Sequence, residues 1–176
     1  TPHRPPQSVI MNIHEACERV RSLILAEFPA GLAIRRDYDT SIPEFQGDRE
    51  QLIQAVLNVA RNAAQALLGA GPAPGGAEIR LSTRGVRQVT LAKRRYRLAL
   101  ELQVIDNGPG IPAELQSEVF ERFARGDTSR SRKGGSTGLG LAIASAVVRA
   151  HSGSIELRSV PGWTEFTVRL PRAVES

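Results

Sequence analysis

The segment from Asp48 to Leu67 carries two stripes of side chains along one helix, and it limits the fold more than any other part of the chain. Apolar residues recur at spacings of four, three, four and four, as on a helix with one buried face. These are Leu52, Val56, Val59, Ala63 and Leu67. A stripe of carboxamides, Asn58, Asn62 and Gln65, follows the edge of that face. The pattern predicts a helix that is capped by Asp48, packs on a core and borders a polar site.

Asn58 and Asn62 lie one helical turn apart, so their carboxamides project in the same direction. A carboxamide oxygen is a hard, neutral ligand that suits Mg²⁺, which keeps several waters and is completed by phosphates. The alternative is an ordinary solvated helix surface. The adjacent apolar stripe weighs against that alternative, because it places both amides beside the core.

The rest of the chain alternates between segments with the periods of helices and of strands. Helices are expected at residues 13–28, 112–123 and 138–150, and strands at residues 9–13, 32–38, 77–83, 86–93, 96–105, 154–160 and 164–170. Pro43 and Gly47 mark a loop, and Pro161-Gly162 marks a hairpin turn. With 176 residues, of which 41% are hydrophobic, the chain can bury one core and fold alone.

Asp106 ends an apolar strand and is followed by Asn-Gly-Pro-Gly, which an ordinary turn would explain. A carboxylate held there can also accept a hydrogen bond from the 6-amino group of adenine. Gly108 and Gly110 would let the base approach the backbone. This second interpretation predicts a site that prefers adenine to guanine.

Gly138-Leu-Gly140 opens the last long helix, where unpaired backbone amides favour a phosphate group. The preceding residues 124–136 are rich in Arg, Ser and Gly, which is typical of a mobile lid. Arg125 and Lys133 could add positive charge to the site, whereas a solvated glycine loop is the alternative. No P-loop or complete dinucleotide fingerprint occurs, so phosphate binding must follow another plan.

We call three short segments the asparagine box (Asn58 to Asn62), the first glycine box (Asp106 to Gly110) and the second glycine box (Gly134 to Gly140). In this order, the boxes resemble those of the catalytic, ATP-binding domain of sensor histidine kinases, in the wider family that includes DNA gyrase, heat-shock chaperone ATPases and mismatch-repair ATPases. The resemblance covers about residues 8–171 and implies the α+β, two-layer Bergerat fold, with a mixed sheet of about five strands, three main helices on one face and a mobile ATP lid. The matching segments are Asn58-Val-Ala-Arg-Asn62-Ala, Asp106-Asn-Gly-Pro-Gly-Ile111, Phe120-Glu-Arg-Phe123 and Gly135-Ser-Thr-Gly-Leu-Gly140.

The resemblance also implies roles for single residues. Asn62 would hold Mg²⁺, Asn58 would lie beside the phosphates of ATP or ADP, and Asp106 would read adenine. Arg125 or Lys133 would neutralise the terminal phosphate, so Asn58 and Arg125 are the residues expected to take part in catalysis. The other implied nucleotide contacts are Gly108, Gly110, Ile111, Phe123, Thr137, Gly138, Leu139 and Gly140. Many such kinases carry a lysine three residues after the magnesium asparagine, where this chain has Gln65.

Asn58 separates two branches of the wider family. The hydrolysing ATPases resemble one another in placing a glutamate there as general base, whereas an amide cannot take a proton from water. Asn58 therefore favours phosphoryl transfer to another acceptor, with catalysis by positioning and electrostatics. The resemblance implies that this acceptor is a histidine on a dimerisation domain, from which a response regulator receives the phosphoryl group. The alternative is a nucleotide-dependent interaction module without kinase activity.

The chain itself does not offer a convincing acceptor histidine. His14-Glu15 begins like the acceptor motif but continues Ala-Cys-Glu-Arg, so His14 is expected to be a helix-start residue. His151 is expected to interact with the end of its helix. Residues 1–7 are then a linker from an upstream phosphoacceptor domain, residues 8–171 the catalytic domain and residues 172–176 a tail. We expect a monomeric fragment of a homodimeric parent.

Several segments resemble nitrogen-regulation sensor kinases of the NtrB type, whereas the lid is more similar to that of membrane-bound sensor kinases. The first group comprises Asn12-Ile-His-Glu, Arg36-Asp-Tyr-Asp, the helix from Gln54 and the Tyr96-Arg-Leu hairpin. The lid segment is Phe120 to Arg132.

Composition narrows the remaining classes of partner and cellular location. A net charge of +5 permits an anionic partner, but aromatic residues make up only 5%, and the basic residues from Arg84 to Arg97 fit a solvated hairpin better than a nucleic-acid surface. The single cysteine, Cys17, excludes an internal disulfide and is expected to be a buried, inert thiol. No apolar run approaches the roughly 20 residues of a membrane span, so the segment is expected to be cytoplasmic, without membrane contact.

Overall fold

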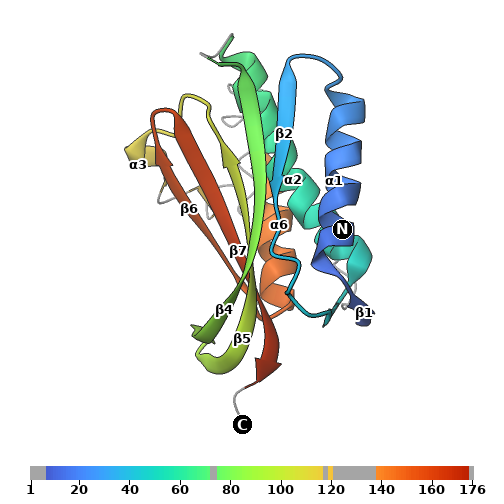
Figure 1. Ribbon diagram of the computed structural model, residues 1–176. Helices are drawn as coiled ribbons and strands as arrows, with labels where there is room; N and C mark the ends of the chain where they lie inside the picture. The colour runs from blue at the N-terminus through green and yellow to red at the C-terminus, as the bar shows by residue number, and fades with distance from the viewer. Residues whose placement is uncertain (1–6, 72–74, 117–118, 121–137, 175–176) are drawn as a thin grey trace.

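A five-stranded mixed sheet forms one layer of the protein. The computed structural model describes residues 7–71, 75–116, 119–120 and 138–174. The strand order is β2-β4-β5-β7-β6, in which β2 runs parallel to β4 and the other neighbours are antiparallel (Figure 1). The strands are β2 (Leu32–Asp37), β4 (Ala77–Leu91), β5 (Arg94–Asp106), β6 (Ser154–Val160) and β7 (Trp163–Val174).

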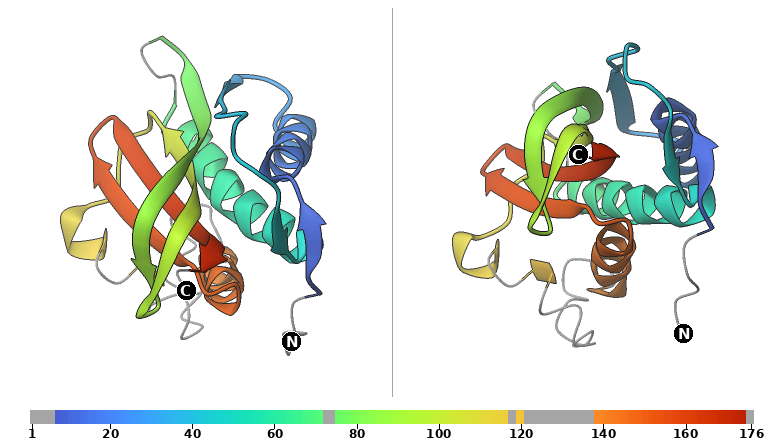
Figure 2. Two further views of the ribbon diagram at one scale, coloured as in Figure 1. Left: turned by 60° about the horizontal axis from the view of Figure 1, so that its bottom comes forward. Right: turned by 90° about the horizontal axis from the view of Figure 1, so that it is seen from below.

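Three long helices lie on the same side of this sheet (Figures 1 and 2). They are α1 (Ile13–Glu27), α2 (Arg49–Gly69) and α6 (Gly138–Ala150). A short helix, α3 (Ala113–Gln116), lies at the β6 edge. Inward residues of β4, β5 and β7, such as Leu81, Leu102 and Phe166, share one core with the helices. This arrangement confirms the expected α+β, two-layer fold.

Local sequence determines where two of the helices begin. The Asn12 side chain accepts a hydrogen bond from the amide of His14 and caps α1, and the Asp48 side chain accepts one from the amide of Gln51 and caps α2. The Asp48 cap is confirmed as expected. The strand expected at residues 9–13 ends earlier, at Met11, because Asn12 starts the helix.

A small second sheet corrects the expected loop at Gly47. The strand β1 (Val9–Met11) pairs antiparallel with β3 (Phe45–Gly47). Phe45 is buried in the core, and a Cβ on Gly47 would lie 2.7 Å from Leu52 Cδ1. Gly47 is therefore required by close packing within a strand, rather than by a turn.

The segment between residues 77 and 106 forms two long strands rather than three, and residues 86–93 belong to the hairpin between them, which was the alternative interpretation of that segment. Gly85 does not break the first strand, because it pairs with Leu100 within the continuous β4–β5 ladder. The connecting turn is Ala92-Lys93, and both residues have positive φ angles, 51° and 66°. The tip of this hairpin buries its own small cluster of Leu91, Tyr96 and Ala99.

The closing hairpin is confirmed around Pro161-Gly162, since Val160 pairs with Trp163 and Gly162 has φ +87°. β7 extends beyond the expected end at residue 170, to Val174. Within the expected helix 112–123, α3 covers Ala113–Gln116, and residues 121–123 lie outside the described residues. The expected lid at residues 124–136, the linker at residues 1–6 and the last two residues also lie outside them.

Two further expectations concern the thiol of Cys17 and the absence of a membrane-spanning helix. Cys17 is completely buried in α1, and burial raises the pKa of its thiol to about 12, so the expected inert thiol is confirmed. Across the helices that the structure describes, none combines the length and apolar character needed to cross a membrane.

Candidate functional site

One hydrogen bond connects two side chains of the amide stripe on α2. Gln54 Nε2 donates a hydrogen bond to Asn58 Oδ1 at 3.0 Å, one helical turn further along. Asn58 is only 7% exposed, and its Nδ2 is a buried donor that has no hydrogen-bond partner among the residues that the structure describes. Asn62, one turn further, is half-buried. The stripe therefore presents one donor, Asn58 Nδ2, that a bound group would satisfy.

Gln54 was missed as a site residue by the sequence reasoning. It lies four residues before Asn58 and so continues the same stripe toward the start of α2. This spacing was available in the sequence and could have identified it.

Asp106 lies at the end of β5 with its carboxylate on the side of the sheet that faces the helices. Alternation along β5 places Leu102, Val104 and Asp106 on that face, and Asp106 is only 4% exposed. Asp106 Oδ1 accepts a hydrogen bond from the amide of Gly108 at 2.9 Å. Burial raises the pKa of Asp106 to about 6, although the Gly108 hydrogen bond opposes this shift.

Two glycines shape the turn that follows Asp106. A Cβ on Gly108 would lie 2.9 Å from Asp106 Oδ1 and 3.3 Å from Leu67 Cδ2, so this turn packs directly against α2. Gly110 has φ +92°, and its Cβ would lie 2.7 Å from the carbonyl oxygen of Val160. Neither position has room for a side chain, and the backbone at both is held close to its neighbours.

The same turn is anchored to the β6–β7 hairpin. The amide of Ile111 donates to Ser159 Oγ at 2.8 Å, and Gln116 Nε2 donates to the carbonyl oxygens of Ile111 and Ser159. The amide of Gly162 donates to the carbonyl oxygen of Gly108 at 2.9 Å. Ile111 thus contributes backbone to the anchor, and these contacts fix the turn beside Asp106 before any ligand binds.

Asn107 is a structural member of the box that the sequence reasoning did not single out. Its Oδ1 accepts from the amide of Glu78 and its Nδ2 donates to the carbonyl oxygen of Gly76, both at 2.9 Å. The side chain therefore joins the Asp106 turn to the start of β4. Asn at the position after the aspartate can make both bonds because its amide carries a donor and an acceptor.

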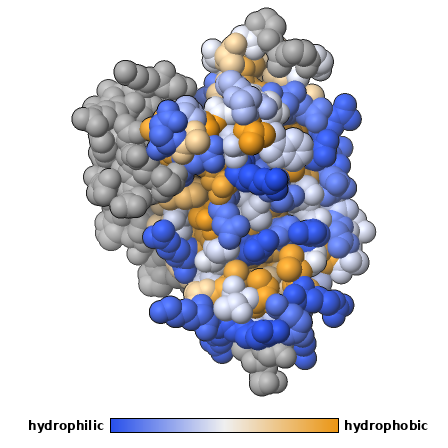
Figure 3. Space-filling model, turned by 90° about the vertical axis from the view of Figure 1, so that its left-hand side faces the viewer, coloured by the Kyte–Doolittle hydropathy of each residue, from blue (hydrophilic) through white to orange (hydrophobic). Residues whose placement is uncertain are grey.

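A cavity of about 440 Å³ opens beside this turn. Its lining includes Pro109, Gly110, Ile111 and Val160. Figure 3 shows this side of the molecule, on which apolar surface is exposed among charged residues. Val160 is 55% exposed and Trp163 40% exposed, so the turn from Gly108 to Ile111 lies next to exposed apolar side chains.

The remaining sequence-predicted residues are only partly covered by the structure. Phe123, Arg125, Lys133 and Thr137 lie outside the described residues. Gly138, Leu139 and Gly140 form the first described turn of α6, as expected for a glycine box that opens a helix. α6 packs against α2, so this turn belongs to the same pair of helices as the amide stripe.

The described residues fit a nucleotide with its magnesium ion. They contain no group of three or more His, Cys, Asp or Glu that could hold a metal ion alone. A single carboxamide such as that of Asn62 suits an ion that phosphates and water complete. The unpartnered Asn58 Nδ2 suits a phosphate oxygen, and the buried Asp106 carboxylate suits an exocyclic amine.

His14 and His151 make contacts that hold the fold together. His14 Nε2 lies 2.8 Å from Thr83 Oγ1, and its ring stacks on Tyr38 with centroids 4.7 Å apart. Burial lowers the pKa of His14, despite the nearby Asp39 and Glu18. His14 is the second residue of α1, which confirms the expected helix-start position. His151 Nδ1 lies 2.8 Å from the carbonyl oxygen of Val147, which confirms its expected contact with the helix end.

Comparisons with known proteins agree with this geometry. Residues 47–174 match the family described as histidine kinase-, DNA gyrase B- and HSP90-like ATPases. The chain is 47% identical over 170 residues to the sensory histidine kinase/phosphatase NtrB of Klebsiella oxytoca. The match covers 97% of this chain and 46% of NtrB, so the chain spans about half the length of that relative.

Two other comparisons extend this result. Over 70 residues, or 40% of the chain, it is 81% identical to the probable sensor histidine kinase TcrY of Mycobacterium tuberculosis, of which the match covers 15%. One part of the chain is therefore much more similar to TcrY than the whole chain is to NtrB. The solved structure of the mycobacterial sensor histidine kinase MprB aligns with a TM-score of 0.69 at 26% identity, covering 96% of this chain and 99% of that one.

The fold, the order of the boxes and the match over residues 47–174 lead to one assignment. The chain belongs to the family of histidine kinase-, DNA gyrase B- and HSP90-like ATPases, and within it to the ATP-binding catalytic domains of sensor histidine kinases.

Proposed function

We propose that this domain binds Mg-ATP and transfers the γ-phosphoryl group to a histidine on a separate dimerisation domain of its parent kinase. The observation that supports this most directly is the buried, unpartnered Nδ2 of Asn58 beside Asn62 on one face of α2. A donor in that position suits a phosphate oxygen, whereas it cannot act as a base toward water.

Each described site residue has a chemical role in this proposal. Asp106 accepts a hydrogen bond from the adenine 6-amino group, and the turn at Gly108 and Gly110 brings backbone close to the base. The first turn of α6, from Gly138, directs backbone amides toward the phosphates. Guanine is excluded because its carbonyl oxygen would face the Asp106 carboxylate.

Asn62 is the residue that would hold magnesium, through its carboxamide oxygen. When bound, the ion neutralises charge on the phosphates and holds them in one arrangement. Arg125 and Lys133 are proposed to contribute positive charge toward the terminal phosphate, and Ile111, Phe123, Thr137, Leu139 and Gly140 to complete the nucleotide site.

The acceptor is proposed to lie outside residues 8–171, on a phosphoacceptor domain reached through the linker at residues 1–7. The packing of His14 against Tyr38 and its contact with Thr83 support this, because both give that histidine a structural role in α1. The parent is proposed to be a homodimer that carries this domain in the cytoplasm and passes the phosphoryl group to a response regulator receiver domain. The similarity of this chain to NtrB supports a role in nitrogen regulation.

Titration calorimetry with ATP, ADP and GTP, with and without Mg²⁺, tests the nucleotide site. Wild type should bind ATP and ADP and should bind GTP poorly. Asn62→Ala should lose the magnesium-dependent part of the affinity while the magnesium-free affinity stays the same. Gln46→Ala removes an exposed carboxamide from β3, outside the site, and serves as the matched control.

Transfer is tested by supplying the phosphoacceptor domain of an NtrB-type kinase together with labelled ATP. Label should appear on the supplied domain and not on this chain. Label retained on a histidine of this chain would refute the proposed acceptor. Magnesium-dependent ATP binding without any transfer would favour an interaction module over a kinase.

A further inference from the structure

Gln54 and Asn58 are joined by a hydrogen bond, and its direction determines which atom of the Asn58 carboxamide is available to a phosphate group. Gln54 lies near the start of α2 with its side chain exposed, whereas Asn58 is 7% exposed. The hydrogen bond between Gln54 Nε2 and Asn58 Oδ1, at 3.0 Å, uses the oxygen of the Asn58 carboxamide. The nitrogen of the same carboxamide is buried and has no partner within the described part of the chain.

A carboxamide can turn over about its last torsion, which exchanges its oxygen and nitrogen positions at little steric cost. A glutamine at position 54 can either donate to the Asn58 oxygen or accept from its nitrogen. In the structure it donates to the oxygen, and this leaves the Asn58 nitrogen available to a bound group. A glutamate at position 54 can only accept, so it would attract the Asn58 nitrogen and turn the oxygen toward the site.

We propose that Gln54 is a positioning residue, which orients the Asn58 carboxamide so that its N–H donors meet the γ-phosphate. This inference rests on the proposed function, because it needs ATP to bind along the α2 stripe. Among the described residues, Gln54 occupies the acceptor of the Asn58 amide, whereas the donor of that amide has no partner. It also predicts discrimination, since an ADP ligand offers no γ-phosphate to this donor.

The test compares ATP and ADP affinities in the presence of Mg²⁺, using Gln54→Glu and the uncharged Gln54→Met. Both substitutions remove the donor to Asn58 Oδ1 at an exposed position, so the helix should be retained. ATP affinity should fall by about tenfold in Gln54→Glu, as for loss of one hydrogen bond to a charged group, and by a smaller factor in Gln54→Met, in which the Asn58 amide is free to turn. ADP affinity should stay within about twofold in both variants. The ratio of the two affinities is a quantity that general destabilisation of α2 would not change.

A double-mutant comparison removes the effect of added charge. In an Asn58→Ala background neither Gln54 substitution should change the ATP to ADP ratio further, because the group that it orients is absent. Ala66→Glu places a negative charge at an exposed position later in the same helix and should leave the ratio unchanged.

The outcomes separate this inference from the function on which it rests. Wild type that fails to bind ATP would refute the proposed function together with the inference. If wild type binds ATP but the Gln54→Met variant has the same ratio of ATP affinity to ADP affinity as wild type, only the role of Gln54 is overturned. An equal loss from Gln54→Met in the Asn58→Ala background would likewise show that Gln54 acts independently of Asn58.

Discussion

His151 Nε2 accepts a hydrogen bond from the backbone amide of Asp48 at 3.0 Å, so the C-terminal end of α6 is fastened to the N-terminal end of α2. Because Nε2 accepts, the neutral ring carries its proton on Nδ1, which donates to the carbonyl oxygen of Val147. The imidazole thus joins the two helices that carry the amide stripe and the second glycine box.

Replacing His151 by alanine should loosen this helix pair. The substitution removes the acceptor of the amide of the buried Asp48 and the donor to a helix-terminal carbonyl, so the free energy of unfolding should fall by about 1–3 kcal/mol. Urea unfolding measures the change. Arg149→Ala, which alters an exposed residue two positions earlier, should have little effect, and equal stabilities of the two variants would contradict the role of His151.

Nucleotide affinity should depend on the ionisation of Asp106. Burial raises its pKa to about 6, and the adenine amine requires the ionised carboxylate as its acceptor. Binding therefore lowers this pKa and releases protons near neutral pH, so ATP affinity should rise from about pH 5 to about pH 7 and then level off. Calorimetry in buffers of different ionisation enthalpy counts the protons released.

Asp106→Asn supplies the control for this pH dependence. It removes the titrating carboxylate but leaves the titration of the ATP phosphates in place, so the difference between the two proteins isolates Asp106. We also expect the variant to bind ATP much more weakly than wild type near neutral pH, and the difference should narrow in acid as Asp106 is protonated. Identical pH profiles for wild type and variant would exclude Asp106 as the titrating group.

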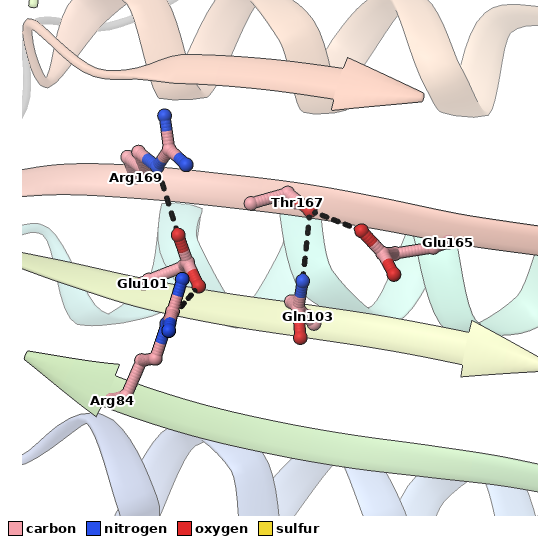
Figure 4. A network of polar contacts seen from close by, with 6 residues as sticks. All are labelled: Arg84, Glu101, Gln103, Glu165, Thr167 and Arg169. Carbon is pink, nitrogen blue, oxygen red and sulfur yellow. Dashed lines mark hydrogen bonds and ion pairs between the residues drawn. The ribbon is translucent and has the colours of Figure 1, made fainter. Parts of the chain in front are cut away.

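Glu101 should contribute to stability at neutral pH but not in acid. Its carboxylate lies on the other face of the sheet, between Arg84 at 2.5 Å and Arg169 at 2.9 Å (Figure 4). Burial alone would raise the pKa of Glu101, but the hydrogen bonds from both arginines outweigh burial and hold it below its ordinary value.

A carboxylate whose pKa is lowered on folding stabilises the protein above its unfolded-state pKa, and this stabilisation is lost as the pH falls through the folded-state pKa. Glu101→Gln should therefore cost about 1–3 kcal/mol at neutral pH, and the difference from wild type should shrink as the pH falls through the lowered pKa of Glu101. Unfolding curves at several pH values test this. Glu156→Gln, at an exposed position of β6, should cost little at any pH.

Gly110→Ala should weaken both the fold and the nucleotide site. Alanine at φ +92° is strained by about 1 kcal/mol, and its Cβ would lie 2.7 Å from the carbonyl oxygen of Val160, so the turn must move away from β6. Melting temperature and ADP affinity should both decrease. A Cβ on Gly69, at the end of α2, would meet nothing within 4 Å, so Gly69→Ala should leave ADP binding unchanged.

Sequence reasoning succeeded where local chemistry decides the structure. Asp48 caps α2 because a short acceptor side chain there meets the next amides, and Pro161-Gly162 forms a turn because glycine accepts φ +87°. The Asp106 strand end and the amide stripe were also visible, since each depends on the period of one element.

It failed where pairing across the chain decides the structure. β3 has only three residues and exists because β1 pairs with it, although Pro43 and Gly47 suggest a loop. Gly85 suggested a break, yet it continues β4 because Leu100 pairs with it. The fastening of Asp48 by His151 joins residues 103 positions apart, which no local pattern indicates.

The glycine-free turn at Ala92-Lys93 lies at the far end of β5 from Asp106. At about 3.3 Å per residue, the strand between them spans about 40 Å, so a group attached at the tip would stay clear of the nucleotide. The chain has one cysteine, which is completely buried. Lys93→Cys would thus provide a single accessible thiol, through which a fluorophore or a surface could be attached with every copy of the nucleotide site presented in the same orientation.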